Sequence, residues 1–210
     1  MPFAVDLPTP TDQIDRLDAL GLLERAGVEA DRLRAAASAA APGLVVLTGV
    51  APSDLVGHLR HADKAGFVVP DMTDVDLFTP LPGLDHPAGP VHLLADPDRG
   101  DHLANWSPDE AMPELLAAGR TPMTLVEGLH WLIQQPVALE RNHCFMTIGS
   151  RLRRANGSLD ARTPALWISN GTGRDGADRR HAPKLGWCWA GNRHTWLGFG
   201  SGSQRTPLPV

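Results

Sequence analysis

The amino-acid sequence predicts a mixed α+β fold, and three observations support this prediction. Apolar residues recur at helical spacing within the segment 1–42, and short apolar runs typical of strands follow at 44–47, 66–69 and 91–94. The last third of the chain changes to short β-like segments separated by Gly, Asn and Pro. We therefore expect N-terminal helices, a β-α-β unit and a C-terminal antiparallel sheet, all in a single globular domain over 1–210.

The N-terminal segment 1–42 is expected to be helical. Apolar side chains at helical spacing predict one helix over about 11–25, and Gly27 just beyond it is typical of a helix C-terminus. A second helix with an Ala-rich face is expected over about 28–40, before a Pro-Gly pair that ends it.

Residues 44–69 match the pattern of a β-α-β unit. The apolar run 44–47 is short enough for a buried strand, Ser53 is placed to cap a helix, and 66–69 supplies a second strand. The two strands of such a unit lie parallel, with a right-handed crossover. We expect 91–94 to be a third strand of the same sheet.

Capping boxes mark two helix starts in the middle of the chain. Ser107 is followed three residues later by Glu110, and Thr124 by Glu127, which is the spacing at which side chain and backbone cap each other. We therefore expect helices to begin at these positions, the first of them ending at Gly119.

The sheet is expected to end in a Trp-rich hairpin over 185–199. Gly191 and Asn192 fit a two-residue turn. This register puts four side chains on one face: Trp187, Trp189, His194 and Trp196. A shift by one residue would instead bring Cys188 near His194 and Trp196. Such a face can stack on a planar ligand or bind a cation, and it can equally be the core side of the sheet.

The segment 170–183 contains almost no apolar residues. It has no face to bury against a core, so a flexible, solvated loop or lid is expected there.

Two acidic segments, 71–76 and 96–102, follow predicted strands. If those strands are parallel, both segments emerge at one sheet edge, where ligands bind in open α/β sheets. Clustered carboxylates can hold Mg²⁺ or Ca²⁺, or supply a general acid or base. The alternative is that Asp is frequent in loops because of its turn chemistry.

A further constellation is Asn142-His143-Cys144 at the start of a predicted strand. Neighbouring strand residues point to opposite faces, so His143 and Cys144 cannot pair as base and nucleophile. With Cys188 and His194 they make four residues of the types that bind zinc, but not at zinc-site spacing. We expect no metal and no organic cofactor, with a divalent metal as the alternative, and we expect Cys144 to be a buried hydrophobe.

Three other histidines are expected to have structural roles. His58 and His61 lie three residues apart on one predicted helix face, which we expect to be solvated. His130 lies within an apolar helix and is expected to be a satisfied core residue.

Charge and cysteine content exclude several classes of protein. A net charge of −5 and a pI near 5.9 argue against binding nucleic acid or anionic membrane through bulk electrostatics. The sequence has no run of about 18 or more apolar residues, and its N-terminus lacks the pattern of a secretory signal. Two cysteines are too few for a disulfide framework. We expect a cytoplasmic protein.

Several stretches resemble a family of small actinobacterial proteins of unknown function. They are GFVVPDMTDVDLF, NWSPDEAMPELLAAGRTPMT, NHCFMTIGSR, PALWIS and KLGWCWAGNRHTWLG. The resemblance covers about residues 10–200, with a longer insert at 170–180, and its hairpin motif is distinctive. It implies no activity and no catalytic residue, only an association with bacterial specialised metabolism.

Two function hypotheses follow. The first is a small-molecule enzyme without an organic redox cofactor, of hydrolase, lyase, isomerase or cyclase type, with its pocket between the acidic segments and the hairpin. Its candidate catalytic residues are Asp101, His143 and His194, and its candidate substrate-binding residues are Trp187, Trp189, Trp196, Asn142 and Arg151. The alternative is a non-catalytic ligand-binding or protein-interaction module that uses the aromatic hairpin. A purely structural Trp core is a third reading. The expected partner is a small molecule, and the oligomeric state stays open.

Overall fold

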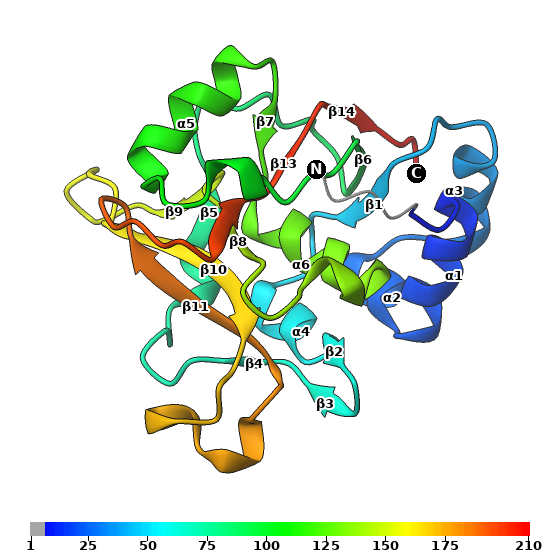
Figure 1. Ribbon diagram of the computed structural model, residues 1–210. Coiled ribbons are helices and arrows are strands. Elements are labelled where there is room, and N and C mark those ends of the chain that lie inside the picture. Colours follow the sequence, from blue (N-terminus) through cyan, green and yellow to red (C-terminus); the bar gives the residue numbers. More distant parts are fainter. Residues whose placement is uncertain (1–6) are drawn as a thin grey trace.

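The computed structural model describes residues 7–210, and it has the mixed α+β fold that the sequence predicts (Figure 1). The first six residues of the predicted helical segment 1–42 lie outside the described residues. Two larger sheets and a central helix make up most of the fold, and N-terminal helices pack beside the smaller of these sheets.

The N-terminal helices are shorter than the periodicity predicts. They are α1 (Pro10–Ala19), α2 (Leu22–Ala26) and α3 (Ala30–Ala37). Thr9 caps α1, because its hydroxyl accepts a hydrogen bond from the Asp12 amide at 3.2 Å. Gly21, at φ 70°, separates α1 from α2, so the helix predicted over 11–25 is two helices.

One sheet has three strands in the order β1, β6 and β14, all antiparallel. The strands are β1 (Leu44–Leu47), β6 (Val91–Ala95) and β14 (Gln204–Pro207). The strand predicted near 91–94 therefore does neighbour the one at 44–47. The third strand of this sheet is β14, near the C-terminus of the chain.

The second sheet has five strands and mixes parallel with antiparallel pairing. In spatial order the strands are β12 (Leu197–Phe199), β8 (Cys144–Met146), β10 (Arg162–Ile168), β11 (Pro183–Trp189) and β4 (Phe67–Val68). The antiparallel pair β10–β11 is its longest ladder, whereas β4 and β12 pair parallel with their neighbours.

The prediction of a β-α-β unit over 44–69 is wrong, because β1 and the strand at 67–68 lie in different sheets. Helix α4 (Pro52–Val56) does follow β1, but a small hairpin of β2 (Arg60–His61) and β3 (Lys64–Ala65) comes next. That hairpin leads the chain to the five-stranded sheet, where β4 pairs with β11. Glycine at position 66 lets the backbone lie close to the end of α4, because a Cβ there would be 2.4 Å from the Val56 carbonyl oxygen.

The prediction of a Trp-rich hairpin over 185–199 is also wrong, because its two strands are not neighbours in the sheet. Strand β11 pairs with β10, placing Trp189 opposite Arg162, and β12 pairs with β8. Backbone groups of the loop between β11 and β12 form hydrogen bonds with other segments: the Asn105 amide donates to the His194 carbonyl at 2.8 Å. The Asp109 amide donates to the Ala190 carbonyl at 3.1 Å. These bonds separate the two strands that the turn signal suggested would pair.

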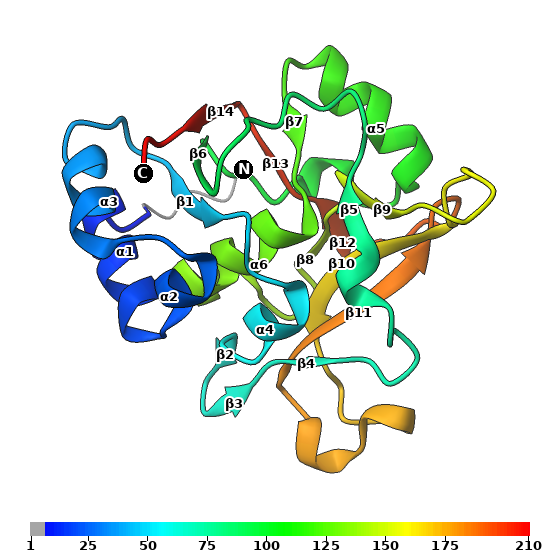
Figure 2. The ribbon, with the colours of Figure 1, turned by 180° about the vertical axis from the view of Figure 1, so that it is seen from behind.

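Helix α6 (Leu125–Gln134) is the centre of the molecule and lies between the two larger sheets (Figures 1 and 2). Its capping box forms as predicted, and so does that of α5 (Pro108–Ala117). Gly128 lets α6 approach the five-stranded sheet, because a Cβ at this position would meet the Thr147 side chain at 2.5 Å.

Short elements complete the fold. Two-stranded ladders join β5 (Phe78–Pro80) to β9 (Ser150–Leu152) and β7 (Thr121–Pro122) to β13 (Ser201–Gly202). The 3-10 helices are η1 (Val75–Leu77), η2 (Asp101–Leu103), η3 (Pro136–Ala138), η4 (Gly173–Asp175) and η5 (Ala177–Arg179). None of the helices within 7–210 has the length and apolar character needed to cross a membrane.

The segment 170–183, predicted to be a flexible loop, projects beyond the ends of β10 and β11 (Figure 1). Asp175, in the middle of this loop, forms an ion pair with Lys184 of β11, whose Nζ lies 2.8 Å from both carboxylate oxygens. The Ser169 hydroxyl donates to the same carboxylate at 2.7 Å. The mobility of this loop stays a prediction.

Candidate functional site

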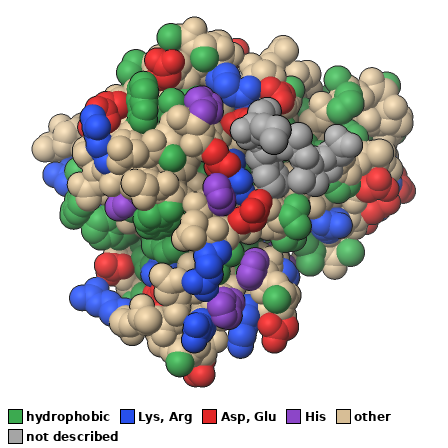
Figure 3. Space-filling model, viewed as in Figure 1, with side chains coloured by type: hydrophobic (Ala, Val, Ile, Leu, Met, Phe, Trp, Pro, Cys, Tyr) green, Lys and Arg blue, Asp and Glu red, His purple; other side chains and the backbone are tan. Residues whose placement is uncertain are grey.

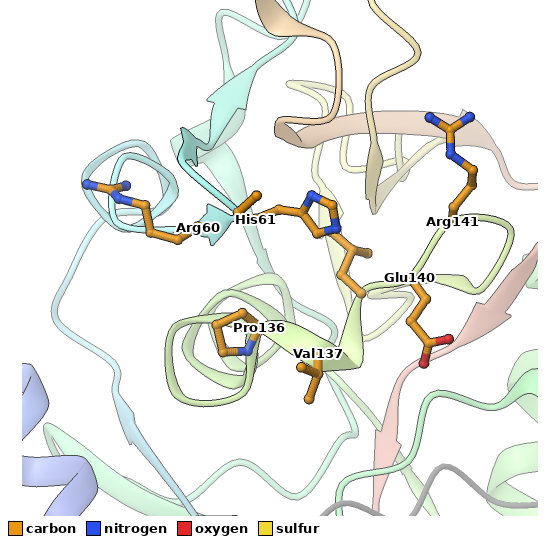
Figure 4. A pocket seen from close by; sticks show the side chains of 8 residues that line it. Arg60, His61, Pro136, Val137, Glu140 and Arg141 are labelled. Carbon is orange, nitrogen blue, oxygen red and sulfur yellow. The ribbon is translucent and has the colours of Figure 1, made fainter.

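A hollow of about 650 Å³ opens between the β2–β3 hairpin and the turn that follows α6 (Figure 4). Its apolar lining comes from Ala62, Pro136, Val137 and Leu139. Small-molecule sites in proteins have volumes of roughly 300–1,000 Å³, with mostly apolar walls and a few placed polar groups. We call this cavity the His61 hollow.

The imidazole of His61 points into the hollow (Figure 4). Its Nδ1 is buried and has no hydrogen-bond partner among residues 7–210. The tight β2–β3 turn fixes this direction, and it contains Ala62 at φ 51°, a left-handed conformation that is strained for alanine. The sequence placed His61 on a solvated helix face, which is wrong because α4 ends at Val56 and His61 lies in a strand.

Charged side chains surround the hollow but are held by other protein groups. Arg60 donates to the Gly57 and Leu59 carbonyl oxygens at 2.7 and 2.8 Å. Arg141 extends to the other side (Figure 4) and contacts His181 Nδ1 at 3.2 Å. Figure 3 shows histidine, basic and acidic side chains gathered on the middle and lower part of this face. His61 is thus a polar group inside an apolar hollow with a charged rim.

A tight turn over 140–143 connects the hollow to two of the predicted catalytic residues. Glu140 and His143 exchange backbone hydrogen bonds of 3.1 Å, and Asn142 occupies the left-handed region at φ 67°. Glu140 lines the hollow, while His143 Nδ1 lies 3.6 Å from the Asp101 carboxylate. Asn142, His143 and Asp101 are therefore brought together beside the hollow.

Asp101 is held by a buried arginine. Arg99 is 4% exposed and donates to both Asp101 oxygens, at 2.8 and 2.7 Å. Burial alone would lower the pKa of Arg99, but hydrogen bonds to Asp101 outweigh it, and the pKa is raised. The distance of 3.6 Å to His143 exceeds a hydrogen bond. Asp101 is therefore held by Arg99 and lies near His143 without a hydrogen bond to it.

The remaining predicted site residues form separate groups. Trp187 and Trp189 stack edge to face at 4.6 Å, and Trp189 is 46% exposed. His194 lies against Trp196, with ring centroids 5.5 Å apart, and burial lowers its pKa. Arg151 lies on β9 and donates to the Thr163 hydroxyl at 2.5 Å. The expectation of one aromatic face carrying three tryptophans and His194 is wrong, because β11 and β12 do not pair.

A second hollow of about 310 Å³ lies where the pocket was expected, between the segment after Asp101 and the loop before β12. Its lining includes Asn105, Trp106 and the ion pair of Arg193 with Glu110. No predicted site residue lines it. This hollow is smaller than the His61 hollow, and its charged groups satisfy each other.

The two acidic segments do not form a shared cation site. Their preceding strands lie in different sheets, so the common edge on which the prediction depended does not exist. Asp74 pairs with Arg162 at 2.6 Å, and Asp76 accepts from the Ser53 amide at 2.8 Å. Asp98 accepts from the Gly100 amide at 2.6 Å. These carboxylates stabilise loops, as the alternative reading expected.

The cysteines also have no metal-site geometry. Within the described part of the chain, neither Cys144 nor Cys188 belongs to a cluster that could hold a metal ion. Burial raises the pKa of both thiols to about 11, so they are protonated near neutral pH. Cys144 is buried, as predicted.

Sequence reasoning missed a buried ionic cluster under the first turn of α6. Glu127 pairs with Arg205 of β14 at 2.6 Å and with His92 of β6 at 2.8 Å, and all three side chains are buried. We call Glu127, His92 and Arg205 the Glu127 cluster. Its members lie far apart in sequence, and the only local signal was the capping box that contains Glu127. His130 is buried nearby, as predicted.

The residues 171–176 carry the spacing G-x-G-x-x-G, which is typical of dinucleotide-binding turns. The segment follows strand β10 but continues into the short helices η4 and η5. A dinucleotide site needs a full helix whose N-terminus faces the pyrophosphate. The structural context of that motif is therefore missing here.

Fold and site together define an α+β protein with a hollow of small-molecule size next to the polar turn over 140–143. The chain belongs to a family of unknown function (DUF5701), whose model matches residues 16–208. The family resemblance expected from the sequence is thereby confirmed at this level. No curated protein and no solved structure matches the chain.

Proposed function

We propose that the protein is a small-molecule enzyme whose ligand occupies the His61 hollow and whose acid–base group is His61. The observation that carries this proposal is the position of the His61 imidazole at an apolar hollow of small-molecule size. Because Nδ1 of this ring is buried, a ligand in the hollow would hydrogen-bond to the imidazole through its other nitrogen, Nε2.

Imidazole chemistry supports a catalytic role. Histidine exchanges protons near neutral pH more readily than any other unperturbed side chain, and it is the commonest general acid or base. The ligand would place an apolar body against Pro136 and Val137 and a hydrogen-bonding group against His61. Reactions that need only proton transfer fit this arrangement: hydrolysis, elimination, isomerisation or cyclisation, without an organic redox cofactor.

The turn over 140–143 supplies the polar edge of the proposed site. Glu140 and Arg141 line the hollow, and the Asp101–His143 pair lies directly beside it. We assign these residues the role of positioning the polar end of the ligand. We further propose a cytoplasmic location, supported by the two free thiols, and a role in actinobacterial specialised metabolism, as the family resemblance implies.

Ligand-observed NMR tests whether the hollow binds small molecules. The probe is a fragment mixture of aromatic and aliphatic amides, alcohols and carboxylic acids. Val137 is 56% exposed at the hollow, so Val137→Trp fills it without disturbing the core. Leu116→Trp is the matched control, because Leu116 is 51% exposed on α5. We expect V137W to weaken binding at least about tenfold, or about 1.4 kcal/mol, and L116W to leave it unchanged. Equal binding by both variants contradicts the proposal.

The role of His61 is tested on the fragments that bind. Each is incubated with wild type and His61→Ala and followed by NMR for conversion. An acid–base role predicts a loss of conversion by at least about 100-fold, with affinity changed far less. Equal conversion by His61→Ala rejects His61 as the acid–base group. Binding without conversion of any fragment rejects the enzyme and leaves a binding protein.

The exposed Trp189 favours a second candidate, a docking surface for a partner protein. Its ring stacks edge to face on Trp187, so it is presented to solvent in a fixed orientation. Tryptophans in such positions are frequent anchors of protein interfaces. Under this reading Trp189→Ala removes partner binding, whereas Val137→Trp does not.

A further inference from the structure

Three potential ligand groups converge beneath the first turn of α6. One ligand atom each from His86, His92 and Glu127 can be chosen so that all lie within 4.8 Å of one another. His92 comes from β6 and Glu127 from α6, while His86 lies in the loop between β5 and β6. None of the three lines the His61 hollow, so this place is distinct from the proposed active site.

His92 is oriented in the way that metal-binding histidines are. Its Nε2 lies 2.8 Å from Glu127 Oε1, and its Nδ1 is buried without a partner among the described residues. Glu127 is also paired with Arg205 through both carboxylate oxygens, so it accepts the hydrogen bond from His92. A carboxylate that only accepts requires the proton on His92 Nε2, and in neutral imidazole the lone pair is then on Nδ1. Ligating histidines almost always donate their other N–H in this way.

Glu127 itself is not free to bind an ion. Arg205 Nε donates to Oε1 at 2.6 Å, and an Arg205 terminal nitrogen donates to Oε2 at 2.9 Å. The Thr124 amide donates to Oε2 at 2.7 Å. With His92 the carboxylate therefore accepts from four donors. Its role is to orient His92, and the ligands are the two imidazoles.

His86 completes the pair. Its ring lies 4.9 Å from that of His92 at an angle of 78°, and the side chain is half-buried. A cavity of about 60 Å³ adjoins His86, with Thr48, Thr124 and Ser150 in its lining. That is room for roughly two waters, each of which occupies about 30 Å³ in the liquid.

We propose that His92 Nδ1 and one ring nitrogen of His86 bind a divalent transition metal ion of the Zn²⁺, Co²⁺ or Ni²⁺ type. Water in the adjoining cavity fills the remaining positions beside Thr124 and Ser150. Imidazole nitrogen suits these ions, whereas Mg²⁺ and Ca²⁺ require oxygen ligands. Arg205 neutralises Glu127 and so weakens the site relative to one with a free carboxylate. The site is therefore a moderate one that exchanges its ion.

Metal titration of the chelator-treated full chain tests this proposal. The probes are Zn²⁺, followed by calorimetry, and Co²⁺, followed by its visible absorption. His86→Ala is the informative variant, because His86 is half-buried in a loop and its loss leaves the Glu127 cluster intact. His102→Ala is the matched control at an exposed histidine. His92→Ala is a second variant, which removes a core side chain and is therefore interpreted only if it folds.

We expect wild type and His102→Ala to bind one equivalent of Zn²⁺, and His86→Ala to bind it at least about tenfold more weakly, the size of effect found when a metal shell is disturbed. Zn²⁺ should raise the Tm of wild type and not that of His86→Ala. Absence of stoichiometric binding by wild type overturns the proposal and leaves Nδ1 to a buried water. Equal binding by His86→Ala also overturns it, because the ion then binds elsewhere.

Discussion

The His61 hollow and the Glu127 cluster both contain an imidazole nitrogen that is buried and unpartnered, but their surroundings differ. In the Glu127 cluster every charge has an opposite charge in contact, and the side chains are sealed under α6. In the hollow the charged groups stay at the rim and the walls beside His61 are apolar and open. The His92 imidazole is fixed within the core, where there is room for an ion or water but not for a larger ligand, whereas the His61 ring lies at an open hollow of small-molecule size.

The largest effect is expected from breaking the ion pair in the Glu127 cluster. Arg205→Met leaves the buried carboxylate of Glu127 without its cation, and such a loss costs about 3–5 kcal/mol. Urea unfolding measures it. Arg25→Ala is the control, because Arg25 pairs with Asp54 at the surface, with exposures of 55% and 44%. That pair should contribute less than about 1 kcal/mol. Equal effects of the two variants would mean that the cluster does not stabilise the core.

Acid should destabilise the protein through His130, which lies beside the cluster on α6. Burial lowers its pKa to about 4, against 6.5 for the free side chain. The Leu47 amide donates to Nε2 at 3.2 Å, so protonation of this nitrogen breaks a backbone contact. Because the unfolded chain takes up the proton first, stability is full above pH 6.5 and is lost as the pH falls toward 4.

The loss through His130 should be on the order of 3 kcal/mol, since one pKa unit corresponds to about 1.4 kcal/mol. Glu127 adds to it below its unfolded pKa near 4.5, because its pKa is lowered in the folded state. Urea unfolding between pH 4 and 8 measures this dependence. His130→Gln should flatten the curve above pH 5, and an unchanged slope would contradict the assignment.

A moderate effect is expected where α6 packs on the five-stranded sheet. A Cβ at Gly128 would lie 2.5 Å from Thr147 Cγ2 and 3.2 Å from Phe145 Cε2. Gly128→Ala should therefore destabilise the fold by about 1–3 kcal/mol through overpacking. Gly191→Ala is the control, since nothing lies within 4 Å of its added Cβ. Thermal unfolding of both variants would show whether the helix and sheet are as close as described.

The smallest effect on stability is expected at the hollow itself. Val137→Ser replaces a side chain that is 56% exposed, so the free energy of unfolding should change by less than about 0.5 kcal/mol. Fragment binding should nevertheless weaken, because the apolar wall is lost. A large loss of stability instead would show that the wall belongs to the core, and the contrast between the two regions would fail.

Local features of the fold could be predicted from the sequence. Both capping boxes form, because Ser107 and Thr124 each meet a Glu three residues away along the same chain segment. The helix predicted over 11–25 was too long, since Gly21 interrupts it. Strand pairing could not be predicted, because it depends on distant segments. The turn pattern at 191–192 does not form a hairpin, because backbone amides of Asn105 and Asp109 hydrogen-bond to the loop that contains it.

The candidate site was predictable only in part. Asp101, Asn142 and His143 do come together, because η2 and the turn over 140–143 place them side by side. The prediction for His61 is wrong because α4 ends at Val56 and does not extend past Gly57. The Glu127 cluster joins residues 35 and 78 positions apart in the chain, a separation at which no spacing rule applies. Ionic partners of this kind become visible only in three dimensions.

Binding of a small molecule beside His61 is tested most directly by NMR of the ¹⁵N-labelled histidine side chains while the fragment mixture is added. If the ligand binds in the His61 hollow, the ring nitrogens of His61 shift on binding, while those of His92 and His130 stay unchanged inside the core. A fragment that binds and shifts the histidines elsewhere, with His61 unaffected, would contradict this location.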